Sequence, residues 1–204
     1  MAVRAGKIIC SGLNYRDTVL EDGAKFPEKP LLFLKPDTAI IGDGEAIVKP
    51  EEVKILTIEA ELAVVIGKKG KNIPREKAWD YIRGCRAAND VTAKDAQKED
   101  IQWTRAKSYD TFLPLSPEVP VNGPLEDVEV CSYINGKLAQ KGNIRDMIFD
   151  IPYLVSYISG IMTLEPGDII LTGTPGGYGK EVRPGDEVRI EISGVGRITN
   201  EVTI

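Results

Sequence analysis

The chain has 204 residues, of which 42% are hydrophobic and 28% charged, and its formal net charge is −5 at pH 7. This length and composition suit one globular domain with a sizeable core. The negative charge, without a basic patch that carries interleaved aromatic residues, argues against a nucleic-acid partner, and no run approaches the ~20 apolar residues that cross a bilayer.

Absent and scarce residue types narrow the possible chemistry. The chain has no histidine, which excludes histidine-based catalytic triads, imidazole acid–base catalysis and histidine zinc sites. Its three cysteines, Cys10, Cys85 and Cys131, form no CxxC pair, so neither a disulfide framework nor a zinc ribbon is indicated. Scattered thiols, and an N-terminus (MAVRAGKIIC) with too short an apolar run for a signal peptide, predict a cytoplasmic protein.

The predicted elements are mostly short strands bounded by turn residues. In chain order, strands are predicted over residues 7–10, 31–34, 55–66, 85–91, 128–134 and 137–140, and in two units that each contain Pro-Gly-Asp, EPGDIILTGTP and RPGDEVRIEISG. Helices are predicted over residues 15–21, 75–82, 93–100 and 151–161. Pro74 is expected to open the second helix and Thr92 to cap the third. Residues 103–120 are expected to form an ordered loop. The pattern predicts a β-rich α+β fold with a few short helices.

Two glutamates lie one residue apart in the stretch TIEAELAVVIG, residues 57–67. Because side chains alternate across a strand, Glu59 and Glu61 are predicted to share one face. Two carboxylates this close repel each other, and burial strengthens the repulsion. One interpretation is an exposed strand end with both carboxylates in water. The other is a cation bound between them.

Asp90, at the end of the predicted strand over residues 85–91, is a candidate third ligand, although a residue there is often an ordinary cap or turn residue. Three carboxylates without histidine or paired cysteine form a hard-ligand set, which selects Mg²⁺, Mn²⁺ or Ca²⁺ over zinc or copper. No GxGxxG after a strand and no P-loop are present, so nucleotide binding has no support.

A set of motifs, in order over about residues 8–202, resembles the fumarylacetoacetate hydrolase family. The matching runs are GLNYRD, PLLFLKP, EAELAVVIGK, ANDVTAKDAQ, QWTRAKSYDTFLPLSP, NGKLAQKGN, DMIFDIPYLVSYIS and GDIILTGTPGG. The resemblance implies a mixed β-sandwich roll in one catalytic domain over residues 1–204, with residues 1–50 as a possible N-terminal strand and lid segment, and a homodimer. It also implies a bound ion, typically Mg²⁺ and sometimes Mn²⁺ or Ca²⁺, held by Glu59, Glu61 and Asp90.

The resemblance also implies roles for other residues. Lys107 matches a lysine that reaches the substrate oxygen, and Gln97 would lie near the metal. Thr174, with Gly173 and the backbone N–H groups of their turn, would hold a substrate carboxylate. Arg16, in the lid, would help to recognise the substrate tail.

The lid departs from the pattern N-Y-x-D-H-x-x-E of many hydrolases in this family, because this chain reads NYRDTVLEDG. Thr18 replaces the histidine of the water-activating dyad, and Glu21 keeps the glutamate position. A hydroxyl can orient a water but cannot take up its proton, so Glu21 would act as the base alone if the fold buries it. Lys94 stands where many relatives have arginine, so a bidentate contact would be lost.

The predicted function is therefore that of a metal-dependent isomerase or decarboxylase. Its substrate would be a small 2-oxo or 2-hydroxy-enol acid or diacid, as in aromatic catabolism, and it would react through an enolate stabilised by the metal and Lys107. One alternative is a carbon–carbon bond hydrolase of the fumarylacetoacetate or acylpyruvate type with a rebuilt lid. Others are a binding protein that keeps the metal site without turnover, and a sugar-acid dehydratase or lyase.

Overall fold

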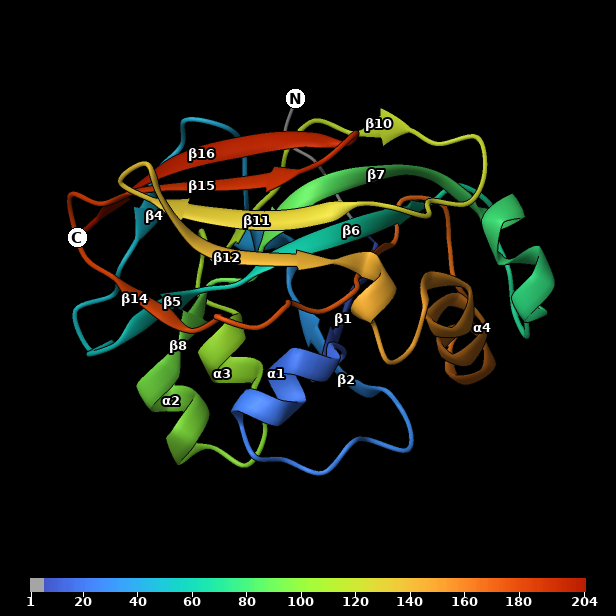
Figure 1. Cartoon of the computed structure of the whole chain (residues 1–204), viewed down its shortest axis with the longest axis horizontal. Coiled ribbons are helices and arrows are strands. Elements are labelled where there is room, and N and C mark those ends of the chain that lie inside the picture. The colour runs from blue at the N-terminus through green and yellow to red at the C-terminus, as the bar shows by residue number, and fades with distance from the viewer. Residues whose placement is uncertain (1–5) are drawn as a thin grey trace.

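The computed structural model describes residues 6–204 and is dominated by strands (Figure 1). Residues 1–5, which begin the expected N-terminal segment and MAVRAGKIIC, lie outside the described residues. The strands are β1 (Ile8–Gly12), β2 (Leu31–Lys35), β3 (Ile40–Ile41), β4 (Ile47–Val48), β5 (Leu56–Ile58), β6 (Ala60–Ile66), β7 (Ile82–Asn89), β8 (Thr92–Ala93), β9 (Leu113–Pro114), β10 (Val119–Pro120), β11 (Glu129–Ile134), β12 (Lys137–Asn143), β13 (Ile169–Leu171), β14 (Lys180–Val182), β15 (Glu187–Ile192) and β16 (Gly196–Thr203). The α-helices are α1 (Arg16–Glu21), α2 (Lys94–Glu99), α3 (Thr104–Lys107) and α4 (Ile151–Ile161), and the 3-10 helices are η1 (Asp37–Ala39), η2 (Arg75–Tyr81) and η3 (Ile144–Asp146).

A six-stranded mixed sheet in the order β10-β7-β6-β13-β1-β2 forms the centre of the molecule. β1 runs parallel to β13, and the other neighbouring strands are antiparallel. Every residue of β6 is buried, and so is every residue of β7 except Arg83. Because successive side chains point to opposite faces of a strand, this burial shows that both faces of β6 and β7 are covered.

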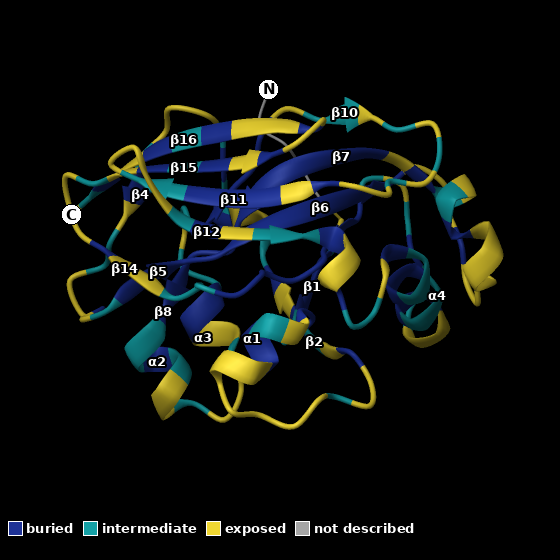
Figure 2. Ribbon diagram, viewed as in Figure 1, coloured by how far each residue is buried: buried dark blue, intermediate teal, exposed yellow. Residues whose placement is uncertain are grey.

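A five-stranded sheet in the order β12-β11-β15-β16-β4 packs against this centre, with β15 in contact with β6 and β7. Figure 1 shows β11, β15 and β16 stacked over β6 and β7, and Figure 2 shows that β6 and β7 are mostly buried. Along β15 the buried residues Val188, Ile190 and Ile192 alternate with more exposed ones, as a strand with one face on the core requires. The predicted β-rich sandwich with a few short helices is confirmed.

The helices lie in two places (Figure 1). α1, α2 and α3 lie together at one edge of the sandwich, and α4 lies apart from them and packs against η2. α4 has the predicted bounds, and the Asp150 side chain caps it by accepting a 2.8 Å hydrogen bond from the Tyr153 N–H. Within residues 6–204, no helix has both the length and the apolar character needed to span a membrane.

The prediction of one strand over residues 55–66 is wrong, because the chain changes sheets at Glu59. β5 belongs to a three-stranded sheet with β14 and β8, whereas β6 belongs to the central sheet. The Glu59 N–H donates to the Asn89 side chain at 3.1 Å, and its carbonyl accepts from the Asp90 N–H at 2.9 Å. These two bonds hold the backbone of Glu59 at the break.

Three local predictions also need correction. Thr92 does not cap a helix: it lies in β8, and α2 begins at Lys94 with Ala93 as its N-cap. The helix after Pro74 is a 3-10 helix, and Pro74 is its cap and not its first residue. The loop predicted over residues 103–120 contains α3, β9 and β10. Each difference depends on contacts with distant segments, which local propensity does not contain.

Candidate active site

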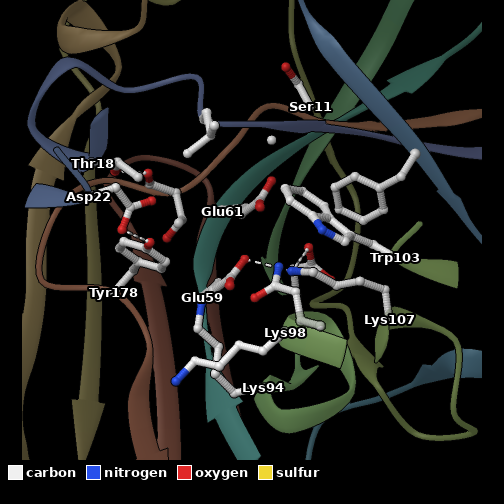
Figure 3. Close-up of a pocket in the computed structure, with 16 residues that line it drawn as sticks. Ser11, Thr18, Asp22, Glu59, Glu61, Lys94, Lys98, Trp103, Lys107 and Tyr178 are labelled. Atoms are coloured by element: carbon white, nitrogen blue, oxygen red, sulfur yellow. Dashed lines mark hydrogen bonds and ion pairs between the residues drawn. The ribbon is translucent and has the colours of Figure 1, made fainter. Parts of the chain in front are cut away.

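Three carboxylates from separate points of the chain meet in one pocket (Figure 3). Glu59 is at the break between β5 and β6, Glu61 is in β6, and Asp90 directly follows β7. The antiparallel register of β6 and β7 pairs Ala60 with Asn89, which brings Asp90 beside Glu59. All three side chains are buried, and one oxygen from each lies within 4.8 Å of the others. The residues that the sequence singled out therefore form one cluster.

Two buried lysines neutralise part of this charge. The Lys107 ammonium donates to Glu59 Oε2 and to Asp90 Oδ2, both at 2.7 Å. The Lys35 ammonium donates to the other Asp90 oxygen at 2.6 Å and to the Val91 carbonyl at 3.3 Å. Burial alone would lower the pKa of Lys107, but the charges of Asp90 and Glu59 outweigh it and raise the pKa. Lys107 is therefore a cation at neutral pH.

Glu61 lacks a lysine partner among the described residues, and one of its carboxylate oxygens accepts a 2.7 Å hydrogen bond from the Gly173 N–H. Burial raises the pKa of Glu61 well above its usual value, and the neighbouring charges of Asp90 and Glu59 raise it further. Gly173 has φ of +97°, and a Cβ there would lie 2.8 Å from the Asn14 Cβ. Only glycine allows this close approach and conformation without strain.

This cluster fits a hard divalent cation. The donors are all carboxylate oxygens, they converge on a common centre, and they are buried. Mg²⁺, Mn²⁺ and Ca²⁺ prefer oxygen ligands of this type, and a divalent cation would offset the mutual repulsion of the carboxylates. Glu59, Glu61 and Asp90 are the residues that would hold it.

The pocket around the cluster has a volume of about 360 Å³, which is within the range of small-molecule sites. Phe33 and Trp103 form one wall, with their rings in an edge-to-face arrangement 5.4 Å apart. Thr18 and Asp22 line the pocket from the α1 segment, and Tyr178 from the turn after β13. The Tyr178 hydroxyl donates to Asp22 at 2.5 Å, so α1 and this turn close the pocket together.

The predicted substrate-binding residues are only partly placed in this pocket. Lys107, Gln97 and Thr174 line it. Gly173 contacts Glu61 through its backbone. Arg16 is exposed on α1 and is not among the residues that line the pocket.

Glu21, the predicted base, is exposed and lies outside the pocket. Its two carboxylate oxygens accept the Gly177 N–H at 3.0 and 2.8 Å. Thr18, at the histidine position of the lid pattern, is buried and donates to the Thr174 carbonyl at 2.7 Å. Both side chains thus fasten α1 to the turn after β13. Glu21 thus contacts the Gly177 backbone outside the pocket, and its role as the base stays a prediction.

The Thr174 hydroxyl is already used within the protein. It donates to the Ala60 carbonyl at 2.8 Å and accepts from the Gln140 amide at 2.9 Å. A hydroxyl has one proton to donate, so a substrate carboxylate would have to meet another donor at this turn. The Gln140 amide also donates to the Pro175 carbonyl, and its oxygen accepts from the Ala60 N–H and the Ser132 hydroxyl.

Sequence reasoning missed several residues that build the site. Lys35 holds Asp90, Asn89 holds the backbone of Glu59, and the Thr92 hydroxyl donates to Glu59 Oε1 at 3.2 Å. Lys35 follows the predicted strand over residues 31–34 and precedes Pro36. A lysine directly after an apolar strand was the one feature that could have indicated its role in the site. Tyr178 and Lys98 also line the pocket, and no sequence feature pointed to them.

Comparison with known proteins gives a consistent result. Residues 7–203 match the family described as fumarylacetoacetate (FAA) hydrolase C-terminal. The chain is 42% identical over 196 residues to the mitochondrial oxaloacetate decarboxylase of Dictyostelium discoideum, covering 93% of this chain and 89% of that protein.

Two solved structures are similar over almost the whole chain. The 5-carboxymethyl-2-hydroxymuconate delta-isomerase of Mycobacterium smegmatis has a TM-score of 0.91 and 42% identity, covering 98% of this chain and 80% of the other. The fumarylpyruvate hydrolase of Pseudomonas aeruginosa, in complex with Mn²⁺ and pyruvate, has a TM-score of 0.93 and 28% identity, covering 99% and 91%.

Proposed function

The chain belongs to the fumarylacetoacetate hydrolase family of enzymes, and on this premise we propose that it is a divalent-metal-dependent isomerase or decarboxylase of small 2-oxo or 2-hydroxy-enol acids. The observation that carries the proposal is the buried cluster of Glu59, Glu61 and Asp90 beside the Lys107 ammonium. A decarboxylase relative, an isomerase structure and a neighbour that binds Mn²⁺ and pyruvate support it. Mg²⁺ is the ion we expect, in a cytoplasmic homodimer.

A divalent ion held by the three carboxylates would supply a Lewis acid that stabilises negative charge on a bound 2-oxo acid. Lys107 supplies a second positive charge. An ammonium has three N–H donors, and Glu59 and Asp90 accept two of them, which leaves one for the substrate. The raised pKa of Lys107 keeps its ammonium charged. The ammonium can therefore stabilise the negative charge that develops on the 2-oxo oxygen when the neighbouring carbon loses a proton or CO₂.

The lid favours this chemistry over carbon–carbon bond hydrolysis. Isomerisation and decarboxylation need stabilised charge next to a carbonyl, whereas hydrolysis also needs an activated water. The Thr18 hydroxyl donates a hydrogen bond to the Thr174 carbonyl, and the Glu21 carboxylate accepts one from the Gly177 N–H. Neither residue therefore resembles a positioned general base.

A comparison of substrates tests the proposal. With Mg²⁺, we expect oxaloacetate to undergo enol–keto conversion or CO₂ release at least ~100-fold faster than acylpyruvates release pyruvate, because a missing general base costs ~10²–10⁴ in rate. Ultraviolet absorbance follows the enol, and a coupled assay follows pyruvate. Comparable cleavage of acylpyruvates would favour the hydrolase alternative. Binding of pyruvate without reaction of any 2-oxo acid would favour a binding protein.

Glu21→Gln separates the two possible roles of Glu21. The amide oxygen of glutamine can still accept the Gly177 N–H, so we expect oxaloacetate isomerisation or decarboxylation to stay within about threefold of the wild-type rate. Any hydrolytic activity that uses Glu21 as its base should fall by ~10²-fold or more. Both reactions are measured on the same preparation. A collapse of both rates, with the melting temperature unchanged, would show that Glu21 takes part in the chemistry.

A further inference from the structure

One carboxylate in the pocket lies outside the metal cluster. Within residues 6–204, four carboxylates line the pocket, and three of them are Glu59, Glu61 and Asp90. The fourth is Asp22, an exposed residue at the C-cap of α1. Glu59 and Asp90 are paired with Lys107, whereas Asp22 forms no ion pair with any described residue. Asp22 is therefore the carboxylate of the pocket that neither the cluster nor a lysine uses.

The other polar side chains of the pocket are poor proton acceptors. Hydroxyl and amide groups take up no proton near neutral pH. The neighbouring carboxylates raise the pKa of Lys107, so its ammonium keeps its proton. Burial and the hydrogen bond to Asp22 raise the pKa of Tyr178, so the phenol keeps its proton as well. Burial lowers the pKa of Lys94, which makes Lys94 the competing candidate for a base.

Tyr178 holds the Asp22 carboxylate by one oxygen. The Tyr178 hydroxyl donates to Asp22 Oδ1 at 2.5 Å, and no described residue donates to the other oxygen, Oδ2. The Tyr178 ring is itself in contact with the Lys94 ammonium, which lies 5.1 Å from the ring centroid. A base that a third group orients in this way is typical of catalytic sites. One oxygen of Asp22 is thus anchored, and the other is available to a bound molecule.

Asp22 and Lys107 lie on opposite sides of the cluster. Figure 3 shows Asp22 on one side of Glu59 and Glu61, and Lys107 on their other side. A 2-oxo acid head at the cluster would therefore lie between a proton acceptor and a cation. When the carbon next to a carbonyl loses a proton, negative charge develops on the carbonyl oxygen. This placement allows one side chain to take the proton while the other stabilises the oxygen.

We propose that Asp22 is the catalytic base that removes a proton from the carbon next to the 2-oxo group, and that Tyr178 positions it. The C–H bond breaks, its electron pair moves to the 2-oxo oxygen beside Lys107, and Asp22 takes the proton directly or through one water. The enolate oxygen then takes up a proton from solvent and Asp22 releases its proton to solvent, so the enol has the same atoms as the keto acid. This inference rests on the proposed function, because the head must bind at the cluster.

Hydrogen exchange isolates this step. Proton NMR in heavy water follows the loss of the methyl protons of pyruvate on the Mg²⁺-saturated protein, and calorimetry gives the pyruvate affinity. We expect the wild type to exchange these protons and Asp22→Asn to exchange them ~10²-fold more slowly, the typical cost of a lost general base. Pyruvate affinity should stay within about twofold, because asparagine keeps an oxygen for the Tyr178 hydroxyl. Asp22→Glu, which restores a carboxylate, should recover at least about a tenth of the wild-type rate.

Two further readouts distinguish chemistry from structure. CO₂ release from oxaloacetate breaks a carbon–carbon bond and not a C–H bond, so Asp22→Asn should slow it by less than about fivefold, whereas a purely structural defect would slow both reactions. Tyr178→Phe keeps the ring and removes the hydroxyl. It should slow exchange about tenfold at unchanged pyruvate affinity, the size of one hydrogen bond to a charged group. The exposed Asp80→Asn, on η2, is the matched control and should change neither rate.

The outcomes separate this proposal from the proposed function. If Asp22→Asn exchanges pyruvate protons at nearly the wild-type rate, or the wild type binds pyruvate without exchange, Asp22 is not the base, while oxaloacetate turnover still supports the function. A larger loss of exchange in Lys94→Met than in Asp22→Asn would assign the base to Lys94. Acylpyruvate cleavage that disappears in Asp22→Asn would show that Asp22 activates water instead. A Mg²⁺-saturated wild type that neither binds pyruvate nor turns over oxaloacetate would overturn both proposals. Melting temperatures near that of the wild type show that the variants are folded.

Discussion

Replacing Glu61 with glutamine is expected to stabilise the metal-free protein and, in the same variant, to abolish metal binding and turnover. The amide can still accept the Gly173 N–H, but it removes a negative charge that burial, Asp90 and Glu59 all disfavour. The amide is also a poor replacement for a carboxylate ligand. Because a metal Lewis acid contributes several kcal/mol to a transition state, we expect at least ~10³-fold slower oxaloacetate turnover.

The pH dependence of this variant follows from the direction of the pKa shift. The pKa of Glu61 is raised in the folded state, so the protonated group contributes stability that is complete below its unfolded value. This stability is lost as the pH rises from about 4.5 through the folded pKa. In the presence of a chelator, the free energy of unfolding of the wild type should fall over that range, and the fall should be smaller in Glu61→Gln.

Calorimetric titration with Mn²⁺ and urea unfolding across pH measure these two effects. The exposed Glu76→Gln is the matched control and should change neither. A Glu61→Gln variant that binds Mn²⁺ with nearly wild-type affinity would remove Glu61 from the ligand set. A variant that is less stable than the wild type at pH 7 without metal would contradict the electrostatic account.

The second large effect is expected from a matched pair of lysine variants. Lys107 and Lys35 are both buried and both contact Asp90, but only Lys107 lines the pocket. Removing one partner of a buried pair costs ~3–5 kcal/mol, so both Lys107→Met and Lys35→Met should be destabilised. Only Lys107→Met should lose ~10²–10³-fold in kcat, because only Lys107 lines the pocket and can donate to a substrate oxygen there.

Metal affinity should show the opposite order, with the larger loss in Lys35→Met and not in Lys107→Met. Lys107→Met leaves Glu59 without a lysine partner and Asp90 with Lys35 alone, so its Mn²⁺ affinity should be retained or increased. Lys35→Met removes the contact that orients Asp90, and loss of such a supporting contact costs ~10–100-fold in metal affinity. Calorimetry on the folded proteins and steady-state kinetics at saturating Mn²⁺ give the two values. Equal losses of kcat in both variants would argue against a direct role for Lys107.

The cluster itself could be predicted from the sequence, and its supports could not. Two glutamates in a strand and an aspartate at a strand end were visible as a pattern. Lys35 was not, because a lysine is almost always exposed unless a distant carboxylate pairs with it, and Asp90 is 55 residues away. The break at Glu59 depends in the same way on the side chain of Asn89.

The lid shows why motif positions alone did not place side chains. Thr18 and Asp22 are four residues apart, on one face of α1 and its C-cap, and both line the pocket. Arg16 is exposed, and Glu21 contacts the turn after β13, but neither residue lines the pocket. Which face turns inward is set by tertiary contacts, such as the hydrogen bond from Thr18 to the Thr174 carbonyl. A six-residue helix has too weak an apolar pattern to reveal this.

Gln140 has a consequence for how this protein can change. It belongs to β12 of the five-stranded sheet, yet its amide bonds the Ala60 backbone and the turn at Thr174 and Pro175. The outer layer is thus mechanically coupled to the strand that carries Glu61. Substitutions in that layer, even those chosen only to raise heat resistance, act on the alignment of the carboxylate cluster. The two sheets are therefore best redesigned as one unit.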